Sequence, residues 1–373
     1  MRAARNVAAP WRHLDITLLV ATLGVAGMGL LMVYSSTRPK QLSAGLDPGY
    51  FLKRQAAYMA IGLVAMAVVA LVDYRRIRDF MPILYGLALL TLILVVSPVG
   101  TSRRGAQAWF QIGSYQFEPS EVAKLVFVVA LAAVCANHRG DLDTGGLLTA
   151  LGIAFVPMAL IYVQPDLGTD MVFAAVLMAV LLVGGAKPRH IALLSLLALT
   201  GVVAIVQFGM LKSYQRDRLT AFLDPQSDGQ RSSYNLRQSQ IAIAAGGIGG
   251  RGLFAGTQTN LSFVPEQHTD FIFTAVGEEL GFVGGVSLLG FFGVMLWRTW
   301  RAAVLARDQF GRLVCVGVLA MLVFQIFENM GMTMGITPIT GIPLPFMSYG
   351  GSAMIASFVG VGLVLNVHMH RFE

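Results

Sequence analysis

Residues 190–211 read HIALLSLLALTGVVAIVQFGML, an apolar run without a single Asp, Glu, Lys or Arg. About 20 consecutive apolar residues are enough for a helix to cross the roughly 30 Å hydrocarbon core of a bilayer. The whole chain agrees with this run, because 55% of its 373 residues are hydrophobic, 13% are charged and the mean hydropathy is +0.67. The sequence therefore predicts an integral membrane protein built from helices.

Comparable apolar runs lie on both sides of this one. The full set falls near residues 14–34, 56–72, 80–99, 119–136, 147–163, 171–186, 190–211, 272–297, 313–333 and 353–368. We therefore expect an all-α membrane protein with about ten transmembrane helices. A basic segment precedes the first run, as in a signal peptide, but the run exceeds the roughly 7–15 apolar residues of a signal peptide.

The loops between the runs predict the orientation of the chain. An even number of crossings places both termini on one side, and Lys and Arg are enriched in the short loops of that side, as at Arg75, Arg76, Lys187 and Arg298. Positive charge is retained on the cytoplasmic face of a membrane. Both termini are therefore predicted to be cytoplasmic, with the longest loop outside.

That longest loop is a polar stretch at residues 212–270, between the seventh and eighth runs. Connections longer than about 12–15 residues are usually functional or disordered. This one contains aromatic residues, such as Tyr234 and Phe254, which disordered segments lack. We predict a large structured extracytoplasmic loop within a single membrane domain that spans residues 1–373, and we expect the chemistry there.

A glycine-rich motif lies inside the loop. Gly247-Ile-Gly249-Gly250-Arg-Gly252 matches the G-x-G-x-x-G pattern of dinucleotide sites. That pattern has meaning only within a strand, turn and helix unit, and here the flanking segments are membrane helices. We reject the dinucleotide interpretation and expect the glycines to permit close backbone packing. The preceding segment, residues 236–245, is predicted to form an interfacial or re-entrant helix.

Two further classes of site are excluded by the distribution of residue types. The basic residues behind the net charge of +7 are dispersed between apolar runs, which argues against nucleic-acid binding. Cys135 and Cys315 lie within apolar runs, where a thiol behaves as a small hydrophobe. Neither a disulfide nor a metal site follows from them.

A carboxylate and an ammonium enter the membrane together at the fourth run. Glu121 and Lys124 are three residues apart, so a helix places them on one face with the acidic residue first, the better orientation for an ion pair. Ionisable groups within a membrane span usually mark a functional site. A mutually neutralising structural pair is the alternative interpretation.

Other polar positions gather at the predicted outer edge. Asp166 is placed to cap a helix, and Trp109 to anchor at the membrane interface in a segment too short to cross it. Residues 337–352 are rich in Pro and Gly, a composition tolerated at membrane depth only when buried in protein or lining a cavity. We expect an outer cavity formed by this segment, the long loop and the start of the run at 119–136.

Taken together, these motifs resemble the SEDS family of bacterial cell-wall polymerases over essentially the whole chain. They are Pro119-Ser120-Glu121 with Lys124, Gln164-Pro-Asp166-Leu-Gly-Thr169, Tyr234-Asn-Leu-Arg-Gln238-Ser239, Gly256-Thr-Gln258, Pro265-Glu-Gln-His268-Thr269-Asp270-Phe, Gly277-Glu278-Glu279-Leu-Gly281 and Pro343-Leu-Pro-Phe-Met-Ser348-Tyr-Gly-Gly351. Gln267 favours the elongation branch of the family over the division branch.

The resemblance implies a peptidoglycan glycosyltransferase of the bacterial inner membrane. It would polymerise lipid II into β-1,4 glycan strands on the outer face, displacing undecaprenyl pyrophosphate with inversion. Asp270 is the candidate base, oriented by His268 and Thr269. The remaining substrate-binding candidates are Arg54, Lys124, Arg216 and Arg218 for the pyrophosphates, Glu121 to hold Lys124, Trp109 on the lipid or sugar path, and Asp166, Gln238, Ser239, Gln258 and Ser348.

The resemblance also implies partners and leaves alternatives open. The partner would be a class B penicillin-binding transpeptidase within a rod-shape complex of membrane proteins. A divalent cation, Mg or Mn, could share the pyrophosphate, although no ligand spacing demonstrates one. A lipid II flippase and a non-catalytic scaffold for the transpeptidase are the rival functions, Asp270 could merely cap a helix, and Arg216 and Arg218 could be solvated loop charges.

Overall fold

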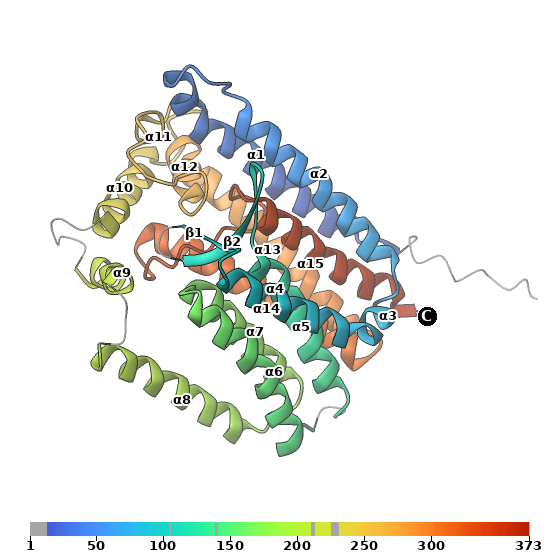
Figure 1. Ribbon diagram of the computed structural model, residues 1–373. Helices are drawn as coiled ribbons and strands as arrows, with labels where there is room; N and C mark the ends of the chain where they lie inside the picture. The colour runs from blue at the N-terminus through green and yellow to red at the C-terminus, as the bar shows by residue number, and fades with distance from the viewer. Residues whose placement is uncertain (1–12, 104–105, 139–140, 210–212, 225–230, 373) are drawn as a thin grey trace, which may run out of the picture.

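The computed structural model describes residues 13–103, 106–138, 141–209, 213–224 and 231–372. Most of the basic N-terminal segment, and residues 212 and 225–230 of the polar stretch, therefore lie outside the described residues. The described part is a bundle of long helices with a small sheet and several short helices at one end (Figure 1).

Eight helices in the described residues are long and apolar enough to cross a membrane. They are α1 (Ile16–Ser43), α2 (Tyr50–Leu71), α5 (Pro119–Ala136), α6 (Thr144–Val163), α8 (Pro188–Gln207), α13 (Gly281–Leu305), α14 (Gln309–Met334) and α15 (Gly351–Met369). Two shorter apolar helices, α4 (Met81–Val96) and α7 (Leu167–Val183), occupy the third and sixth expected runs. The chain is a multi-pass helical membrane protein, whereas the number of ten crossings stays a prediction.

The centre of the bundle is formed by α5, α14 and α15, whose side chains are mostly buried. Small residues allow the backbones to approach. Gly62 of α2 faces Phe358 of α15 so closely that an added Cβ would lie 2.6 Å from the ring. Helix association within a membrane depends on such close packing, since lipid tails remove the hydrophobic driving force between helices.

Helix α8 differs from the others. It lies apart from the bundle along one edge, beyond α7 (Figure 1), and has no buried side chain among its described residues. After it the polar stretch forms α9 (Ser213–Leu223), α10 (Arg231–Gly246) and α11 (Thr257–Asn260). The helix predicted at residues 236–245 is confirmed as the second half of α10.

The glycine run after α10 packs against the start of the next membrane segment. A Cβ on Gly246 would lie 1.9 Å from the carbonyl oxygen of Gly277, and one on Gly250 2.1 Å from that of Glu279. Glycine alone permits this approach of two backbones. Within the predicted motif, close packing is therefore confirmed for Gly250, whereas a Cβ on Gly247 or Gly249 would meet open space.

The eighth run is not one continuous helix as expected. It divides into α12 (Ile272–Glu279) and α13, which starts at Gly281 with φ +64. Gly281 contacts the glycine run, where an added Cβ would lie 2.2 Å from the Gly250 nitrogen. The break follows from this contact, because the left-handed backbone at the joint is accessible to glycine without strain.

The segment between α4 and α5 forms a sheet that the all-α prediction did not include. Its antiparallel strands are β1 (Thr101–Arg103), β2 (Ala106–Ile112) and β3 (Tyr115–Phe117), in the order β1-β2-β3. Gly113, with φ +60, starts the two-residue turn between β2 and β3, as tight hairpins require. The sheet lies against the helical body near the start of α5 (Figure 1).

The two ends of the described chain meet at one end of the bundle. The ring of His13 contacts that of Phe372, in the short helix η2 (His370–Phe372), with centroids 4.9 Å apart and planes tilted by 57°. Asp15 forms an ion pair of 2.6 Å with Arg298 near the end of α13. We call this the terminal end; it also holds the short helix α3 (Tyr74–Asp79), whose Tyr74 binds Asp308.

Candidate functional site

A cavity of about 1040 Å³ opens at the end of the bundle opposite to the terminal end. Its wall combines the starts of α2, α5, α7 and α15, the sheet, α9, and loop residues 266–270 and 338–343. Helices that enter the membrane from this end thus present their first turns to one space. The outer cavity predicted from the Pro- and Gly-rich segment, the long loop and the start of α5 is confirmed as a cavity.

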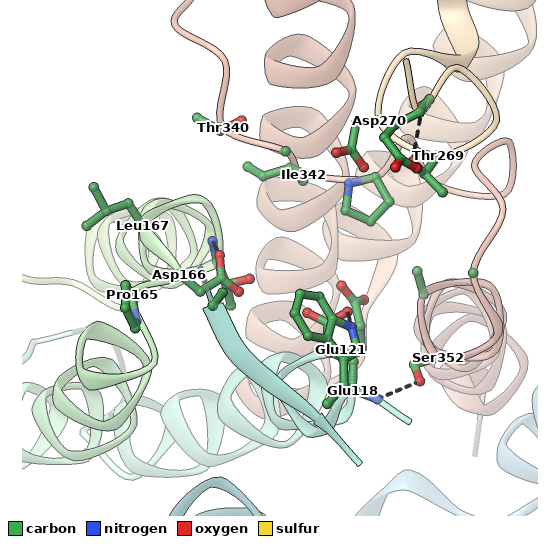
Figure 2. A pocket seen from close by; sticks show the side chains of 18 of the residues that line it. Glu118, Glu121, Pro165, Asp166, Leu167, Thr269, Asp270, Thr340, Ile342 and Ser352 are labelled. Carbon is green, nitrogen blue, oxygen red and sulfur yellow. Dashed lines mark hydrogen bonds between the residues drawn. The ribbon is translucent and has the colours of Figure 1, made fainter. Parts of the chain in front are cut away.

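Eight of the predicted site residues line this cavity: Arg54, Trp109, Glu121, Asp166, Arg218, His268, Thr269 and Asp270. Figure 2 shows Asp166, Glu121 and Asp270 around the cavity, each from a different element. The cavity therefore brings together side chains that are far apart in the sequence. Their individual roles stay predictions.

Asp270 closes a tightly held loop. The backbone turns at Glu266, whose φ of +56 is left-handed, and the Thr269 nitrogen returns a hydrogen bond of 3.1 Å to the Glu266 carbonyl. The N-cap position of α12 is Phe271, and no side chain caps that helix. The helix-cap alternative for Asp270 thus finds no support, and its carboxylate faces the cavity (Figure 2).

Arg218 approaches the same place from α9. Its Nη1 donates to the Thr340 carbonyl at 2.7 Å. Gly341, with φ +83, lies beside both groups, since a Cβ built there would be 3.6 Å from Asp270 Oδ2 and 3.6 Å from Arg218 Nη2. The cavity therefore presents an acid and a guanidinium over one short stretch of backbone.

Arg54 of α2 is held in a fixed position in the cavity wall. Its guanidinium donates to the hydroxyls of Tyr50 at 2.5 Å and Tyr58 at 3.1 Å, and to the Ser114 carbonyl at 2.6 Å. It also lies 4.7 Å from the ring centroid of Tyr115, within the range of a cation–π contact. Contacts with the sheet and with α2 thus order this cation before any ligand binds.

Glu118 is a cavity residue that the sequence reasoning missed as a site. The indole nitrogen of Trp109 donates to its Oε2 at 3.1 Å, and the Ser120 hydroxyl donates to its Oε1 at 3.0 Å. Burial, together with the nearby carboxylates of Glu121 and Asp166, raises the pKa of Glu118 to about 8. An acid just before the proline that starts a helix was the available signal.

Asp166 fulfils the structural role that the sequence allowed. Its Oδ1 accepts a hydrogen bond of 3.1 Å from the Thr169 nitrogen at the start of α7. The other side of the carboxylate faces the cavity (Figure 2). Capping a helix and lining the cavity are thus compatible at this position.

Lys124 does not line the cavity. It is 2% exposed, and its ammonium lies 2.7 Å from Glu121 Oε1. The predicted ion pair is confirmed, but it directs the ammonium into the bundle and not toward a pyrophosphate. Arg216 is exposed on α9 and also lies away from the cavity wall.

Four other predicted binding residues lie outside the cavity wall, and three of them make hydrogen bonds within the protein. The Ser239 hydroxyl donates to the Thr333 carbonyl at 2.6 Å, and the Ser348 hydroxyl donates to the Thr269 carbonyl at 2.6 Å. The backbone nitrogen of Gln258 donates to the Glu278 carboxylate at 2.7 Å. Gln238 lies part-buried on α10, outside the cavity wall. The three hydrogen bonds join the long loop to α14, to α12 and to the segment before α15.

The described residues do not fit a metal site. They contain no group of three or more His, Cys, Asp or Glu side chains placed to hold an ion. Three of the cavity carboxylates, Glu118, Glu121 and Asp166, contact an indole, a hydroxyl, an ammonium and a backbone nitrogen. The described residues therefore provide no ligand set for a divalent cation.

The side of the cavity between α6, α7 and the end of α8 is apolar. It is lined by Met158, Tyr162, Met171, Ile205 and Val206. Because α8 lies apart from the bundle, this side faces the region that lipid would occupy around the helices (Figure 1). The cavity thus joins a polar compartment with an apolar one.

Comparison with known proteins identifies the family. The family described as "Cell cycle protein", with the members FtsW, RodA and SpoVE, matches residues 16–373. Stage V sporulation protein E of Bacillus subtilis (strain 168) is 37% identical over 356 residues, covering 95% of this chain and 96% of that protein. Peptidoglycan glycosyltransferase MrdB of Escherichia coli (strain K12) is 37% identical over 359 residues, covering 96% and 94%.

Solved structures agree with this similarity. A chain described under "Structural coordination of polymerization and crosslinking by a peptidoglycan synthase complex" is 34% identical, with a TM-score of 0.81 over 96% of this chain and 99% of that chain. The rod shape determining protein RodA of Thermus thermophilus is 30% identical, with a TM-score of 0.72 over 99% of both chains. The resemblance to the SEDS polymerases is therefore confirmed: the chain belongs to the FtsW, RodA and SpoVE family.

Proposed function

We propose that this protein is a peptidoglycan glycosyltransferase that joins lipid II units into β-1,4 glycan strands during cell elongation. The observation that carries the proposal is the cavity in which the Asp270 carboxylate and the Arg218 guanidinium flank Gly341. An acid and a cation side by side suit a sugar transfer whose leaving group is a pyrophosphate. The similarity to MrdB, itself named a peptidoglycan glycosyltransferase, supports the same reaction.

The proposed reaction is one direct displacement. The 4-hydroxyl of the sugar at the end of an incoming lipid II attacks the anomeric carbon of the growing strand. The new carbon–oxygen bond forms as the bond to undecaprenyl pyrophosphate breaks, so an α-linked donor gives a β-linked product. Asp270 accepts the hydroxyl proton, a role in which a positioned carboxylate contributes about 10²–10⁴-fold.

Two cations are available for the departing pyrophosphate. Arg218 lies next to Asp270, and Arg54 faces the cavity from α2. A guanidinium presents several donors in a planar arrangement that matches phosphate oxygens. Because Tyr50, Tyr58 and the Ser114 carbonyl already order Arg54, binding would immobilise few additional groups.

The apolar side of the cavity would take the lipid of the substrate. Its residues belong to α6, α7 and α8. An undecaprenyl chain could enter there from the bilayer while the sugars and the pyrophosphate reach the polar compartment. The pairing of the two compartments favours a substrate with a lipid tail and a charged head.

The location and partners belong to the same proposal. We place the cavity on the outer face of the bacterial inner membrane and both termini in the cytoplasm, which the meeting of the described chain ends opposite to the cavity supports. The proposed partner is a class B penicillin-binding transpeptidase within the rod-shape complex. A similar chain described within a peptidoglycan synthase complex supports a transpeptidase partner.

Polymerisation of purified lipid II, followed by gel, tests the proposal. The native chain is compared with Asp270→Asn, which removes the base and keeps the shape, alone and with the transpeptidase. Asp47→Asn is the matched control, since Asp47 is exposed and pairs with Lys53 outside the cavity. We expect strands from the native chain and Asp47→Asn, and none from Asp270→Asn.

Two other results would contradict parts of the proposal. Equal strand formation by Asp270→Asn would overturn the assignment of the base. If the native chain forms no strands even with its partner, a lipid II flippase or a scaffold for the transpeptidase replaces the polymerase, and transport assays in vesicles distinguish these two.

A further inference from the structure

Asn329 joins the two backbone segments that flank the Asp270 carboxylate. It lies on α14 and is fully buried. Its Nδ2 donates to the carbonyl oxygen of Asp270 at 2.8 Å and to that of Ile342 at 2.8 Å. Asp270 ends the loop at residues 266–270, whereas Ile342 follows Gly341 in the other cavity segment (Figure 2).

An amide is unusually well suited to this position. Two carbonyl oxygens that face the same point repel each other, and the NH₂ group of an amide supplies one hydrogen to each. The reverse orientation would direct Oδ1 at two acceptors, so the contacts themselves define which atom is the nitrogen. One short side chain thereby fixes the separation of two loops that belong to different parts of the chain.

The Asp270 segment is held by three such contacts in a row. The carbonyl of His268 accepts from the Tyr349 nitrogen at 2.8 Å, that of Thr269 from the Ser348 hydroxyl, and that of Asp270 from Asn329. The first two donors belong to the segment before α15. Asn329 is the contact nearest to the carboxylate, and it connects the segment to α14.

The buried amide of Asn329 has a feature that lowers the stability of the bundle. Its Oδ1 is buried and has no hydrogen-bond partner among the described residues. Burying an unpaired acceptor costs free energy, and such exceptions to complete pairing are typical of functional sites. The favourable part of the arrangement is the pair of bonds to Asp270 and Ile342.

We propose that Asn329 is a positioning residue, which sets the direction of the Asp270 carboxylate by clamping its backbone to the Gly341–Ile342 segment. The inference rests on the proposed function, because it concerns the geometry of the base. Loss of the clamp would let the carboxylate move relative to Arg218, and a displacement of about 1 Å at a reacting group costs on the order of 100-fold in rate.

The chain contains a matched control at its terminal end. Asn366 of α15 is also fully buried, and its Nδ2 likewise donates to two backbone carbonyls, those of Val69 and Val72. Asn329→Leu and Asn366→Leu therefore remove the same pair of donated hydrogen bonds at opposite ends of the bundle, and Asn366→Leu also removes the Oδ1 acceptor of the Tyr74 nitrogen. Asn329→Asp keeps the shape of the side chain while removing at least one donor, and serves if the leucine variant does not fold.

The experiment measures lipid II polymerisation and hydrogen exchange of the full-length protein with its partner. We expect Asn329→Leu and Asn329→Asp to lower kcat about 10–100-fold without changing KM. Peptides covering residues 266–270 and 339–343 should exchange faster. Asn366→Leu should lower thermal stability while keeping kcat. Equal kcat losses in the Asn329 and Asn366 variants, or unchanged exchange in the Asn329 variants, would overturn the inference.

The two proposals can fail separately. Faster exchange in the Asn329 variants, together with full activity of Asp270→Asn, would keep the clamp and reject Asp270 as the base. Unchanged exchange in the Asn329 variants, together with an inactive Asp270→Asn, would reject the clamp and keep the base.

Discussion

The ammonium of Lys124 lies 2.7 Å from Oε1 of Glu121, and the two side chains are 2% and 4% exposed. The pair occupies the first turns of α5, directly behind the cavity wall that Glu121 helps to form. A charge buried at this depth is tolerated only with its partner. Lys124 therefore acts on the cavity through Glu121.

Removing one member of this ion pair should destabilise the protein more than removing both. Lys124→Met leaves the Glu121 carboxylate buried without compensation, and we expect a loss of about 3–5 kcal/mol in the free energy of unfolding. The double variant Glu121→Gln/Lys124→Met should lose clearly less. Unfolding in detergent measures both, and a single variant as stable as the native chain would contradict the prediction.

Gly341 provides a test of the backbone between the acid and the guanidinium. Ala at this position strains a backbone with φ +83 and places a methyl group 3.6 Å from Asp270 and Arg218. Gly45→Ala is the control, because Gly45 has φ +67 with open space around it. Both variants should lose about 1–2 kcal/mol of stability, and only Gly341→Ala should lose roughly 10-fold or more of polymerisation rate. Equal activity of the two would show that the position is insensitive.

A hydroxyl network supports the loop before Asp270. Thr259 donates to Glu278 at 2.7 Å and accepts from Gln267 at 2.9 Å. Thr259→Val leaves these buried groups short of partners, so we expect the free energy of unfolding to fall by about 1–3 kcal/mol. Thermal unfolding measures this loss. Thr299→Val should be nearly neutral, because the Thr299 hydroxyl donates only to the Met295 carbonyl of its own helix. Equal losses would argue against a special role for the network.

Glu118 should make the stability dependent on pH. Its pKa rises from 4.5 to about 8 on folding, so the folded state binds more protons than the unfolded state between these values. The stability that Glu118 contributes is fully present below pH 4.5 and is lost as the pH rises through 8. The thermal midpoint should therefore fall from pH 5 to pH 8.5, and Glu118→Gln should reduce that fall. If the thermal midpoint of Glu118→Gln fell as much as that of the native chain, the pH dependence would belong to other groups.

The membrane helices could be predicted because bilayer thickness imposes the length of an apolar run. Their ends could not. Helix α1 continues to Ser43, about nine residues beyond the run that ended near residue 34, because hydropathy reports the bilayer and not the helix. The break between α12 and α13 depends on a contact between Gly281 and Gly250, which no local pattern contains. The sheet was predictable in part, since Gly113-Ser114 between alternating segments is a hairpin signal.

The candidate site, like the fold, was predicted in part, and the rest depends on tertiary contacts. Motif residues such as Asp270 and Asp166 were predicted to lie near the cavity, and they do. Lys124 was assigned to the substrate because its charge is visible in the sequence, whereas its burial is not. Asn329 was missed as a site residue because its contacts are with backbone carbonyls, to which any residue could contribute.

The meeting of the chain ends opposite to the cavity has a pharmacological consequence. With the termini in the cytoplasm, as proposed, a blocking molecule reaches the polar compartment without crossing the inner membrane. Poor permeability of that membrane would then have little influence on potency. The apolar side of the cavity further favours amphiphilic compounds, which concentrate in the bilayer next to α8 before they bind.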